Sequence, residues 1–375
     1  MADDTGVLSV DDERVVVIGP VAHGGHFIAH SDGRTLFVRH ALPGETVRVR
    51  VTEVASRIVR ADAVEVLEPS PDRVAPPCRW SGRGGCGGCD FQHVVLPVQR
   101  QLKTQVLRES LQRFGHVVAD DPVLSVEVEE LPGAPDGLRW RSRMTWAQAP
   151  DGTRGLHPHR SHDVIGVDDC LIAELNVAHP DDPIPGRVQR TVRDRSWRLV
   201  GGDFWQVHSA LPEALVDAVL TLGQPYGGET WWDLYAGAGL FSAFLGEAVG
   251  PDGAVEAVES SGEALRSARR AMHDLTIIHL HEANVAAWLA MTDSPSPHGV
   301  VLDPPRAGAG AKVVDAIVSR GPAAVVYVAC DPVALGRDVA LFAQQGYRLE
   351  GLQSFDAFPM THHFETVARL TRVAD

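Results

Sequence analysis

Residues 231–249, WWDLYAGAGLFSAFLGEAV, decide the fold class of this chain. A short apolar run is followed by a loop with two glycines and then by a segment with helical spacing. Apolar strand-like runs and helical segments keep alternating as far as residue 373. This alternation is typical of a doubly wound α/β sheet. We therefore predict an α/β fold over residues 206–375.

The glycine loop and the acid that follows it predict a site for an adenosine-containing cofactor. Gly237 and Gly239 let backbone amides approach a ligand without hindrance from a Cβ atom. Glu259 ends the next predicted strand, where a carboxylate can bind two ribose hydroxyls. A dinucleotide fingerprint has a third glycine for the pyrophosphate, and this chain has Ser242 there. The pattern therefore favours S-adenosylmethionine over NAD.

Two later strand ends carry polar residues that belong at the same edge of the sheet. In LDPPRAGAG, residues 302–310, two prolines stiffen the chain beyond Asp303. Cys330 ends the run AVVYVAC and precedes a predicted helix start at Asp331, whose dipole would favour a thiolate. Taken alone, Asp303 fits a rigid turn and Cys330 fits a buried core thiol. Amino-group methyltransferases place an aromatic residue where this chain has Arg306, so amino methylation is disfavoured.

A methyl donor beside a cysteine indicates methylation at carbon 5 of a pyrimidine. Carbon 5 is too weakly nucleophilic to take a methyl group directly. A thiolate that adds to carbon 6 turns the ring into an enolate, and carbon 5 can then attack the methyl sulfonium. A base must next remove the carbon-5 proton. Glu365, in FPMTHHFETVARL, is the carboxylate that we predict for this step.

The front of the chain has a different pattern. Residues 14–67 alternate apolar and polar positions in short runs that Gly-Gly, Asp-Gly and Pro-Gly separate. This spacing predicts an antiparallel barrel of about five strands, either an oligonucleotide-binding architecture or a simple spacer. A Pro-rich linker and a helix over residues 96–115 follow. Strand-like pieces lie around VEVEEL, RSRMTWAQ and DVIGV.

The five cysteines do not indicate a disulfide framework, because their number is odd and we expect a cytoplasmic chain. Cys78, Cys86 and Cys89 lie on a glycine-rich loop, which predicts a metal or cluster site. The Cys-x2-Cys pair alone leaves zinc and iron–sulfur equally open. The surrounding glycines favour iron–sulfur, because their amides can point at sulfides.

Composition limits the class of protein. The chain has 375 residues, 44% hydrophobic and 22% charged, which is ordinary for a globular protein of two or three domains. An acidic N-terminus and the lack of a long apolar run lead us to expect a cytoplasmic protein. The net charge of −15 argues mildly against nucleic acid. However, residues 78–116 and 138–160 each carry a local charge of +4.

These motifs resemble the RNA (uracil-5-)methyltransferases that modify bacterial tRNA and 23S rRNA. WDLYAGAGLFS resembles the cofactor loop of that family, VEAVE its acidic strand, and VLDPPRAG its acid-proline loop. VYVACDPVALGRD resembles the nucleophile motif, with Ala329 where relatives commonly have Ser. FDAFPMTHHFETVARL resembles the terminal base motif. Five motifs occur in the family's order over nearly the whole chain.

The resemblance implies a role for each matching residue. Cys330 would add to uracil carbon 6, and Glu365 would take the carbon-5 proton. His208 stands where the family usually has Asn, which leaves the role of that position open. The residues implied at the cofactor, of which the first would contact cofactor or uracil, are Gln206, Tyr235, Gly237, Glu259, Asn284 and Asp303.

The resemblance also implies a domain plan. A TRAM-like barrel at 14–70 would be followed by a central α+β iron–sulfur domain at 71–205. Residues 206–375 would form a class I S-adenosylmethionine methyltransferase (Rossmann-like) domain. Cys170 matches the distant fourth ligand of a [4Fe-4S] cluster in some relatives, joining Cys78, Cys86 and Cys89, although the first spacing is two residues longer here. We expect a structural or RNA-positioning cluster, and a monomer.

Two other functions stay open from the sequence. An RNA-binding iron–sulfur protein without catalysis would bind RNA but transfer no methyl group. A methyltransferase for DNA or a small molecule would not need the barrel or the arginine-rich stretches 79–113 and 139–160. The set of Cys330, Glu365, Asp303 and Gln206 favours methylation of uracil carbon 5 in RNA, with tRNA and 23S rRNA both open as substrates.

Overall fold

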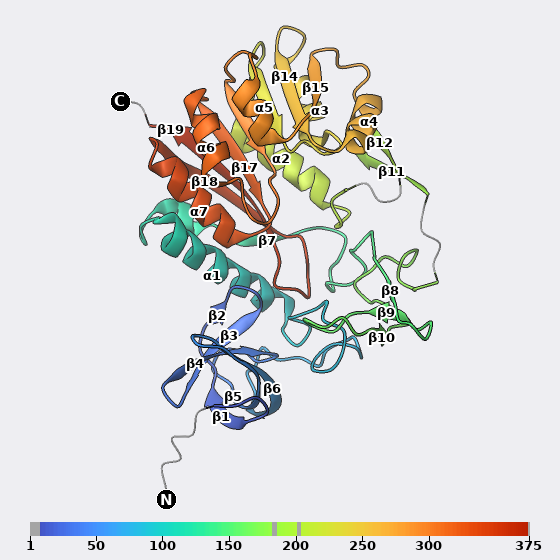
Figure 1. Ribbon diagram of the computed structural model, residues 1–375, viewed down its shortest axis with the longest axis vertical. Coiled ribbons are helices and arrows are strands. Elements are labelled where there is room, and N and C mark those ends of the chain that lie inside the picture. The colour runs from blue at the N-terminus through green and yellow to red at the C-terminus, as the bar shows by residue number, and fades with distance from the viewer. Residues whose placement is uncertain (1–7, 182–185, 201–203, 374–375) are drawn as a thin grey trace, which may run out of the picture. The chain divides into compact units, whose positions relative to one another are not determined.

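The computed structural model describes residues 8–181, 186–200 and 204–373, and Figure 1 shows its ribbon coloured along the chain. The chain forms two compact units. Unit 1 comprises Met1–Val106, Ala134–Asp182 and Phe358–His363. Unit 2 comprises Leu107–Gly133, Pro183–Ala357 and Phe364–Asp375.

Unit 1 begins with a β-sheet of six strands in the order β1-β5-β6-β4-β3-β2. The alternation predicted for this stretch is present, since Val47, Val49 and Val51 on one strand are fully buried. Asp32 and Gly33 both have positive φ and form the tight turn of one hairpin. The strands are β1 Glu13–Val17, β2 Val21–Ala22, β3 His26–Ser31, β4 Arg34–Arg39, β5 Thr46–Val54 and β6 Val59–Glu68.

The rest of unit 1 contains little regular structure. A small sheet joins β8 Ala147–Gln148, β9 Arg154–Leu156 and β10 Ile165–Gly166. The prediction of a strand around RSRMTWAQ was therefore right only at its end. Arg141 makes one isolated bridge, to Ala173, and without a second neighbouring pair no ladder forms there. Helix α1, Leu96–Gly115, confirms the predicted helix and runs through the boundary between the units.

Unit 2 is built on an eight-stranded sheet in the order β15-β14-β13-β16-β17-β19-β18-β7. The first five strands are parallel, and β19 runs antiparallel to both of its neighbours. Residues of the central strands such as Val300, Val301 and Val326 are fully buried, as expected for parallel strands covered on both faces. This sheet confirms the predicted α/β fold.

The elements of unit 2 follow in chain order. The strands are β7 Val128–Glu130, β11 Arg187–Val192, β12 Arg195–Val200, β13 Thr230–Leu234, β14 Ala254–Glu259, β15 Ile278–Glu282, β16 Gly299–Leu302, β17 Ala324–Ala329, β18 Tyr347–Asp356 and β19 Glu365–Arg372. The helices are α2 Leu211–Gly223, α3 Leu240–Val249, α4 Gly262–Ala271, α5 Val285–Met291, α6 Gly310–Ser319 and α7 Pro332–Ala343, with a short 3-10 helix at Pro122–Ser125. Within the three described ranges, every helix is too short or too polar to cross a bilayer.

Candidate active site

The residues predicted for the cofactor stand along one edge of the sheet in unit 2. Tyr235 follows β13, Glu259 ends β14, and Asp303 follows β16. The parallel register aligns the last residue of β13, Leu234, with positions on both neighbouring strands, so these three side chains follow aligned strand ends. Asn284, after β15, caps α5 by accepting a hydrogen bond from Ala287. The structure thus brings these four predicted residues to the carboxyl edge, where open α/β sheets bind ligands.

The glycine loop between β13 and α3 is shaped for close approach of a ligand. Gly237 and Gly239 both have positive φ, and a Cβ atom on Gly239 would lie 2.5 Å from the Met272 side chain. The Gly237 amide donates to Glu259 Oε2 at 3.0 Å, which links the loop to the predicted ribose acid. Ser242, at the position that excluded a dinucleotide fingerprint, donates to Asp233 instead.

Asp233 is a buried acid at the start of this loop. Burial raises its pKa to about 6, and its Oδ1 atom has no hydrogen-bond partner among the described residues. At Gly237, by contrast, nothing lies within 4 Å of the position of a Cβ atom, so the loop leaves open space through which a ligand can approach its backbone. The residues at this edge therefore suit S-adenosylmethionine.

Cys330 and Glu365 are brought together by strand register. Strands β17 and β19 pair antiparallel, with Ala329 opposite Thr366 as the last pair. One step further along the same register places Cys330 opposite Glu365. Glu365 is only 4% exposed, whereas Cys330 is half-buried. The predicted nucleophile and the predicted base thus share the edge that carries Asp303.

The thiol of Cys330 is not a low-pKa thiol in the free protein, so the expectation of a favoured thiolate was wrong. Burial raises its pKa to about 12, and the nearby Glu365 and Asp303 carboxylates act in the same direction. Asp331 caps α7 by accepting from the Val333 and Ala334 amides, which satisfies the helix terminus with a carboxylate rather than with the thiolate. Burial also raises the pKa of Glu365 well above its usual range.

Arg306 is the cation that acts on this pair. Its guanidinium lowers the pKa of both Cys330 and Glu365, against the effect of burial. The side chain itself is exposed. From the sequence, Arg306 had no predicted electrostatic role and was used only as evidence against amino methylation.

Asp338 positions the loop that carries Asp303 and Arg306. Its buried carboxylate accepts hydrogen bonds from the Tyr327 hydroxyl at 2.6 Å and from the Ala309 amide at 2.7 Å. A Cβ atom on Gly308 would lie 2.7 Å from the same carboxylate, so the loop passes close against it. The sequence offered one signal, a charged residue on the apolar side of a predicted helix.

Two predicted positions have local roles in the structure. Gln206 lies in the coil before α2. His208 is fully buried, and its Nδ1 atom accepts from the Ala210 amide at 3.2 Å. Burial lowers the pKa of His208 to about 4, so the ring is neutral near pH 7 and helps to start α2.

Asp303 gives a testable dependence of stability on pH. Burial and the Asp233 charge raise its pKa to about 7, above the 3.8 of a free side chain. Between these values the folded protein holds a proton that the unfolded chain releases, so the free energy of unfolding falls as the pH rises from about 4 to 7. One proton accounts for at most about 1.4 kcal/mol per pH unit. Asp303→Asn should remove this part of the slope in chemical denaturation at several pH values.

A matched control for that experiment is Asp315→Asn, which removes an exposed carboxylate on α6. The control should unfold with the pH dependence of the unmodified protein. If the free energy of unfolding depends on pH in the same way for Asp303→Asn and for the unmodified protein, Asp303 ionises normally in the fold and the prediction is contradicted.

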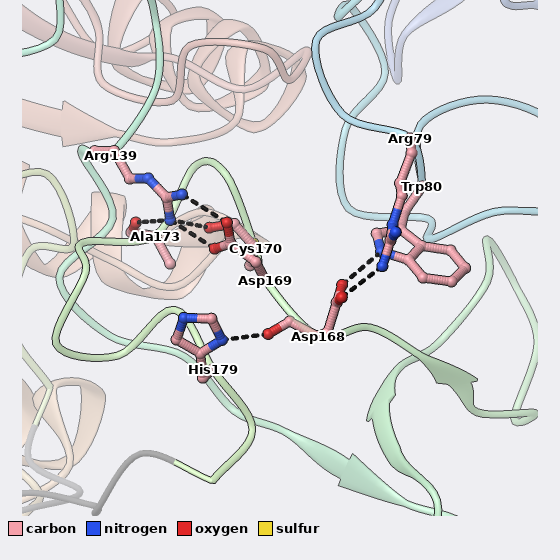
Figure 2. Close-up of polar contacts among 8 residues, drawn as sticks. All are labelled: Arg79, Trp80, Arg139, Asp168, Asp169, Cys170, Ala173 and His179. Atoms are coloured by element: carbon pink, nitrogen blue, oxygen red, sulfur yellow. Dashed lines mark hydrogen bonds and ion pairs between the residues drawn. The ribbon is translucent and has the colours of Figure 1, made fainter.

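The four cysteines predicted as ligands lie in unit 1 and line one pocket. Burial raises the pKa of Cys86, Cys89 and Cys170, and neighbouring thiols raise it further. Figure 2 shows how Cys170 is held: Arg139 donates to its carbonyl, and also to the Asp169 carboxylate and the Ala173 carbonyl. Among the described residues, no group of three or more His, Cys, Asp or Glu side chains is arranged as a metal site.

Comparison with known proteins decides the family. A profile described as tRNA (Uracil-5-)-methyltransferase matches residues 180–373. An uncharacterized RNA methyltransferase from Streptomyces avermitilis is 39% identical, over 97% of this chain and 99% of the relative. The chain belongs to the tRNA (uracil-5-)-methyltransferase family. It is therefore an RNA uracil-C5 methyltransferase that depends on S-adenosylmethionine, as the motifs predicted.

Other likenesses agree with this family. A TRAM domain profile matches residues 11–64, which confirms the predicted TRAM-like domain. The prediction of about five antiparallel strands was wrong in detail, because the sheet has six strands and β4 pairs parallel with β6. The 23S rRNA (uracil(1939)-C(5))-methyltransferase RlmD of Chromohalobacter salexigens is 30% identical, over 94% of this chain and 88% of the relative. The solved structure of a Pyrococcus abyssi tRNA (uracil-54, C5)-methyltransferase with S-adenosyl-L-homocysteine shares the fold, with a TM-score of 0.68 at 20% identity, over 95% of this chain and 99% of that one.

Proposed function

We propose that this family member methylates carbon 5 of a uridine in 23S rRNA or tRNA through a covalent adduct with Cys330. The observation that carries the proposal is the register of β17 and β19, which sets Cys330 opposite Glu365 beside Asp303. A nucleophile and a carboxylate base on one edge with a cofactor loop are the groups that this reaction needs.

The residues act in a fixed order. Cys330 gives its proton to solvent, and its thiolate forms a bond to uracil carbon 6, which breaks the carbon 5–carbon 6 double bond and moves the electron pair to O4. Carbon 5 then attacks the methyl group of S-adenosylmethionine, and S-adenosylhomocysteine leaves. The Glu365 carboxylate takes the carbon-5 proton, the ring double bond re-forms, and the bond between sulfur and carbon 6 breaks. A raised pKa makes Glu365 a stronger base once it is ionised.

The cofactor would be held by Gln206, Tyr235, Gly237, Glu259, Asn284 and Asp303. Glu259 is the candidate for the ribose hydroxyls, because the loop amide at Gly237 already orients it. Arg306 would stabilise negative charge as the thiolate forms and the enolate develops, since it already lowers the pKa of both reacting side chains.

This function is tested by incubating the protein with methyl-labelled S-adenosylmethionine and with rRNA and tRNA from cells that lack the gene. The label is expected in 5-methyluridine at one position of one RNA class. Label in another nucleoside would contradict uracil methylation. RNA binding without transfer would favour the non-catalytic alternative.

We also propose that Cys78, Cys86, Cys89 and Cys170 hold a [4Fe-4S] cluster in a central iron–sulfur domain at 71–205, between a barrel at 14–70 and a methyltransferase domain at 206–375. Support comes from the single pocket that all four thiols line, where burial and then neighbouring thiols raise the pKa of Cys86 and Cys89. The Gly88 amide already donates to Cys86 Sγ, as amides do around cluster sulfurs. Such a cluster would stabilise the fold of this region and has no step in methyl transfer.

The cluster gives a prediction that does not depend on activity. Protein reconstituted anaerobically with iron and sulfide should contain about four of each per chain and absorb broadly in the visible range. Cys170→Ser should lose that absorbance. Cys330→Ser should keep it, because that thiol lies in the other unit. Zinc bound in place of iron, or equal losses in both variants, would contradict the assignment.

A further inference from the structure

The hairpin of β11 and β12 in unit 2 presents an exposed polar face. Its register pairs Gln189 with Arg198 and Thr191 with Ser196, and the side chains of both pairs are exposed. Arg187 is also exposed, on the same side of β11 as Gln189. We call Arg187, Gln189, Thr191, Ser196 and Arg198 the arginine face. It carries hydrogen-bond donors and two full positive charges, and it has no carboxylate.

The opposite side of the hairpin is attached to the cofactor loop. Trp197 is fully buried, and its indole N–H donates to the carbonyl of Ala238 at 2.9 Å. Its ring also packs against Phe244 on α3, with ring centroids 6.2 Å apart. A ligand bound to the arginine face would therefore lie on a hairpin whose other side contacts the cofactor loop at Ala238.

Ion pairs divide the arginines of this hairpin into two groups. Arg193 pairs with Asp217, and Arg195 pairs with both Glu247 and Asp274, which fixes the hairpin to the rest of unit 2. Arg187 and Arg198 have no carboxylate partner among the described residues. The paired arginines thus stabilise the fold, and the two on the arginine face are left to bind something else.

Helix α4 extends the positive surface. It packs along β12, as Figure 1 shows, and Ser267 on this helix donates to the Arg198 carbonyl at 3.4 Å. Arg266, Arg269 and Arg270 are exposed on α4, and within the described ranges no carboxylate pairs with them. The two elements hold eight arginines against Asp194 and Glu263, a net +6 within a chain of −15.

We propose that the arginine face binds the phosphate backbone of RNA next to the uridine to be methylated. Guanidinium groups with neighbouring hydroxyl and amide donors match phosphate oxygens, and in protein–DNA complexes the contacts that position the protein go mainly to the sugar-phosphate backbone. The hairpin ends at Val200, six residues before Gln206. Extrusion of a stacked uridine costs free energy, and contacts to the flanking backbone can offset that cost. The inference rests on the RNA substrate of the proposed function.

Binding is measured with the Cys330→Ala protein, so that no methyl transfer is needed. The probe is a fluorescent stem-loop RNA with a uridine in its loop, titrated at several salt concentrations. The double variant Arg187→Ala/Arg198→Ala should weaken binding about ten- to a hundredfold and lower the salt slope by about 1.4 to 1.8. In a Cys330-containing background, KM for RNA should rise by the same factor while kcat stays within about twofold.

The matched control is Arg348→Ala/Arg372→Ala, which removes two exposed charges from the end of β18 and β19 farthest from Glu365. The control should bind RNA as the parent does. A second variant, Arg187→Lys/Arg198→Lys, keeps the charge and should keep most of the salt slope. Unchanged RNA binding in the alanine variant, an equal loss in the control, or loss of binding to phosphatidylserine vesicles alone would each overturn the proposal. Failure of methyl transfer with RNA binding intact would instead count against the proposed function.

Discussion

Replacement of Cys330 by alanine should reduce methyl transfer to RNA by at least about four orders of magnitude, because the proposed mechanism activates uracil carbon 5 through this thiolate. The variant should fold normally, since the half-buried side chain loses only a thiol that is protonated in the free protein. Single-turnover transfer of a labelled methyl group measures the loss, and thermal unfolding checks the fold.

Ala329→Ser is the matched control for this variant. It changes the neighbouring residue on the same strand to the one that relatives commonly carry, and it should transfer methyl groups within a few-fold of the unmodified rate. Activity of Cys330→Ala within tenfold of the unmodified protein would mean that Cys330 is a structural thiol. The register of β17 and β19 would then have no catalytic meaning.

Glu365→Gln should separate methylation from release. In the proposed mechanism the addition of Cys330 and the methyl transfer precede proton removal, so the variant should form the methylated adduct and then fail to resolve it. Turnover should fall by about 10² to 10⁴, the usual contribution of a general base. The measure is the fraction of RNA that migrates with the protein in a denaturing gel and carries the labelled methyl group.

The glutamine amide is a conservative replacement for the carboxyl group of Glu365. Burial raises the pKa of Glu365, so the folded protein already favours a neutral side chain there. Glu350→Gln, on the neighbouring strand β18, makes the same chemical change at a surface ion pair and should turn over normally. Normal turnover by Glu365→Gln, with no adduct, would exclude this residue as the base.

The gathering of Asp303 and Cys330 at the carboxyl edge of the sheet could be predicted because local patterns mark the strand ends. Apolar runs that stop at Asp303 and Cys330 locate strand ends, and parallel strands bring their carboxyl ends to one edge. Glu365 was predicted as the base from the chemistry and from family resemblance. Its position opposite Cys330 depends on an antiparallel register that only the folded sheet defines.

Three features could not be predicted, because no periodic pattern in the sequence marks them. The β11–β12 hairpin escaped prediction because Arg190 and Arg195 occupy inward positions and break its alternation, and Arg195 is satisfied there by distant carboxylates. The Asp338 contacts join a helix to a loop almost thirty residues away in sequence, and no short-range pattern reports them. The direction of the Cys330 pKa was missed for the same reason, since it is set by burial and by Glu365, which is distant in sequence.

The most direct test of the covalent mechanism uses RNA in which uridine is replaced by 5-fluorouridine. Fluorine at carbon 5 leaves Glu365 no proton to remove, so the adduct should persist after incubation with S-adenosylmethionine and denaturation. Mass spectrometry of the digested complex should find a methylated 5-fluorouridine nucleotide on the peptide that contains Cys330. An adduct on a different cysteine, or no adduct from a preparation that methylates ordinary RNA, would contradict the assignment of Cys330 as the nucleophile.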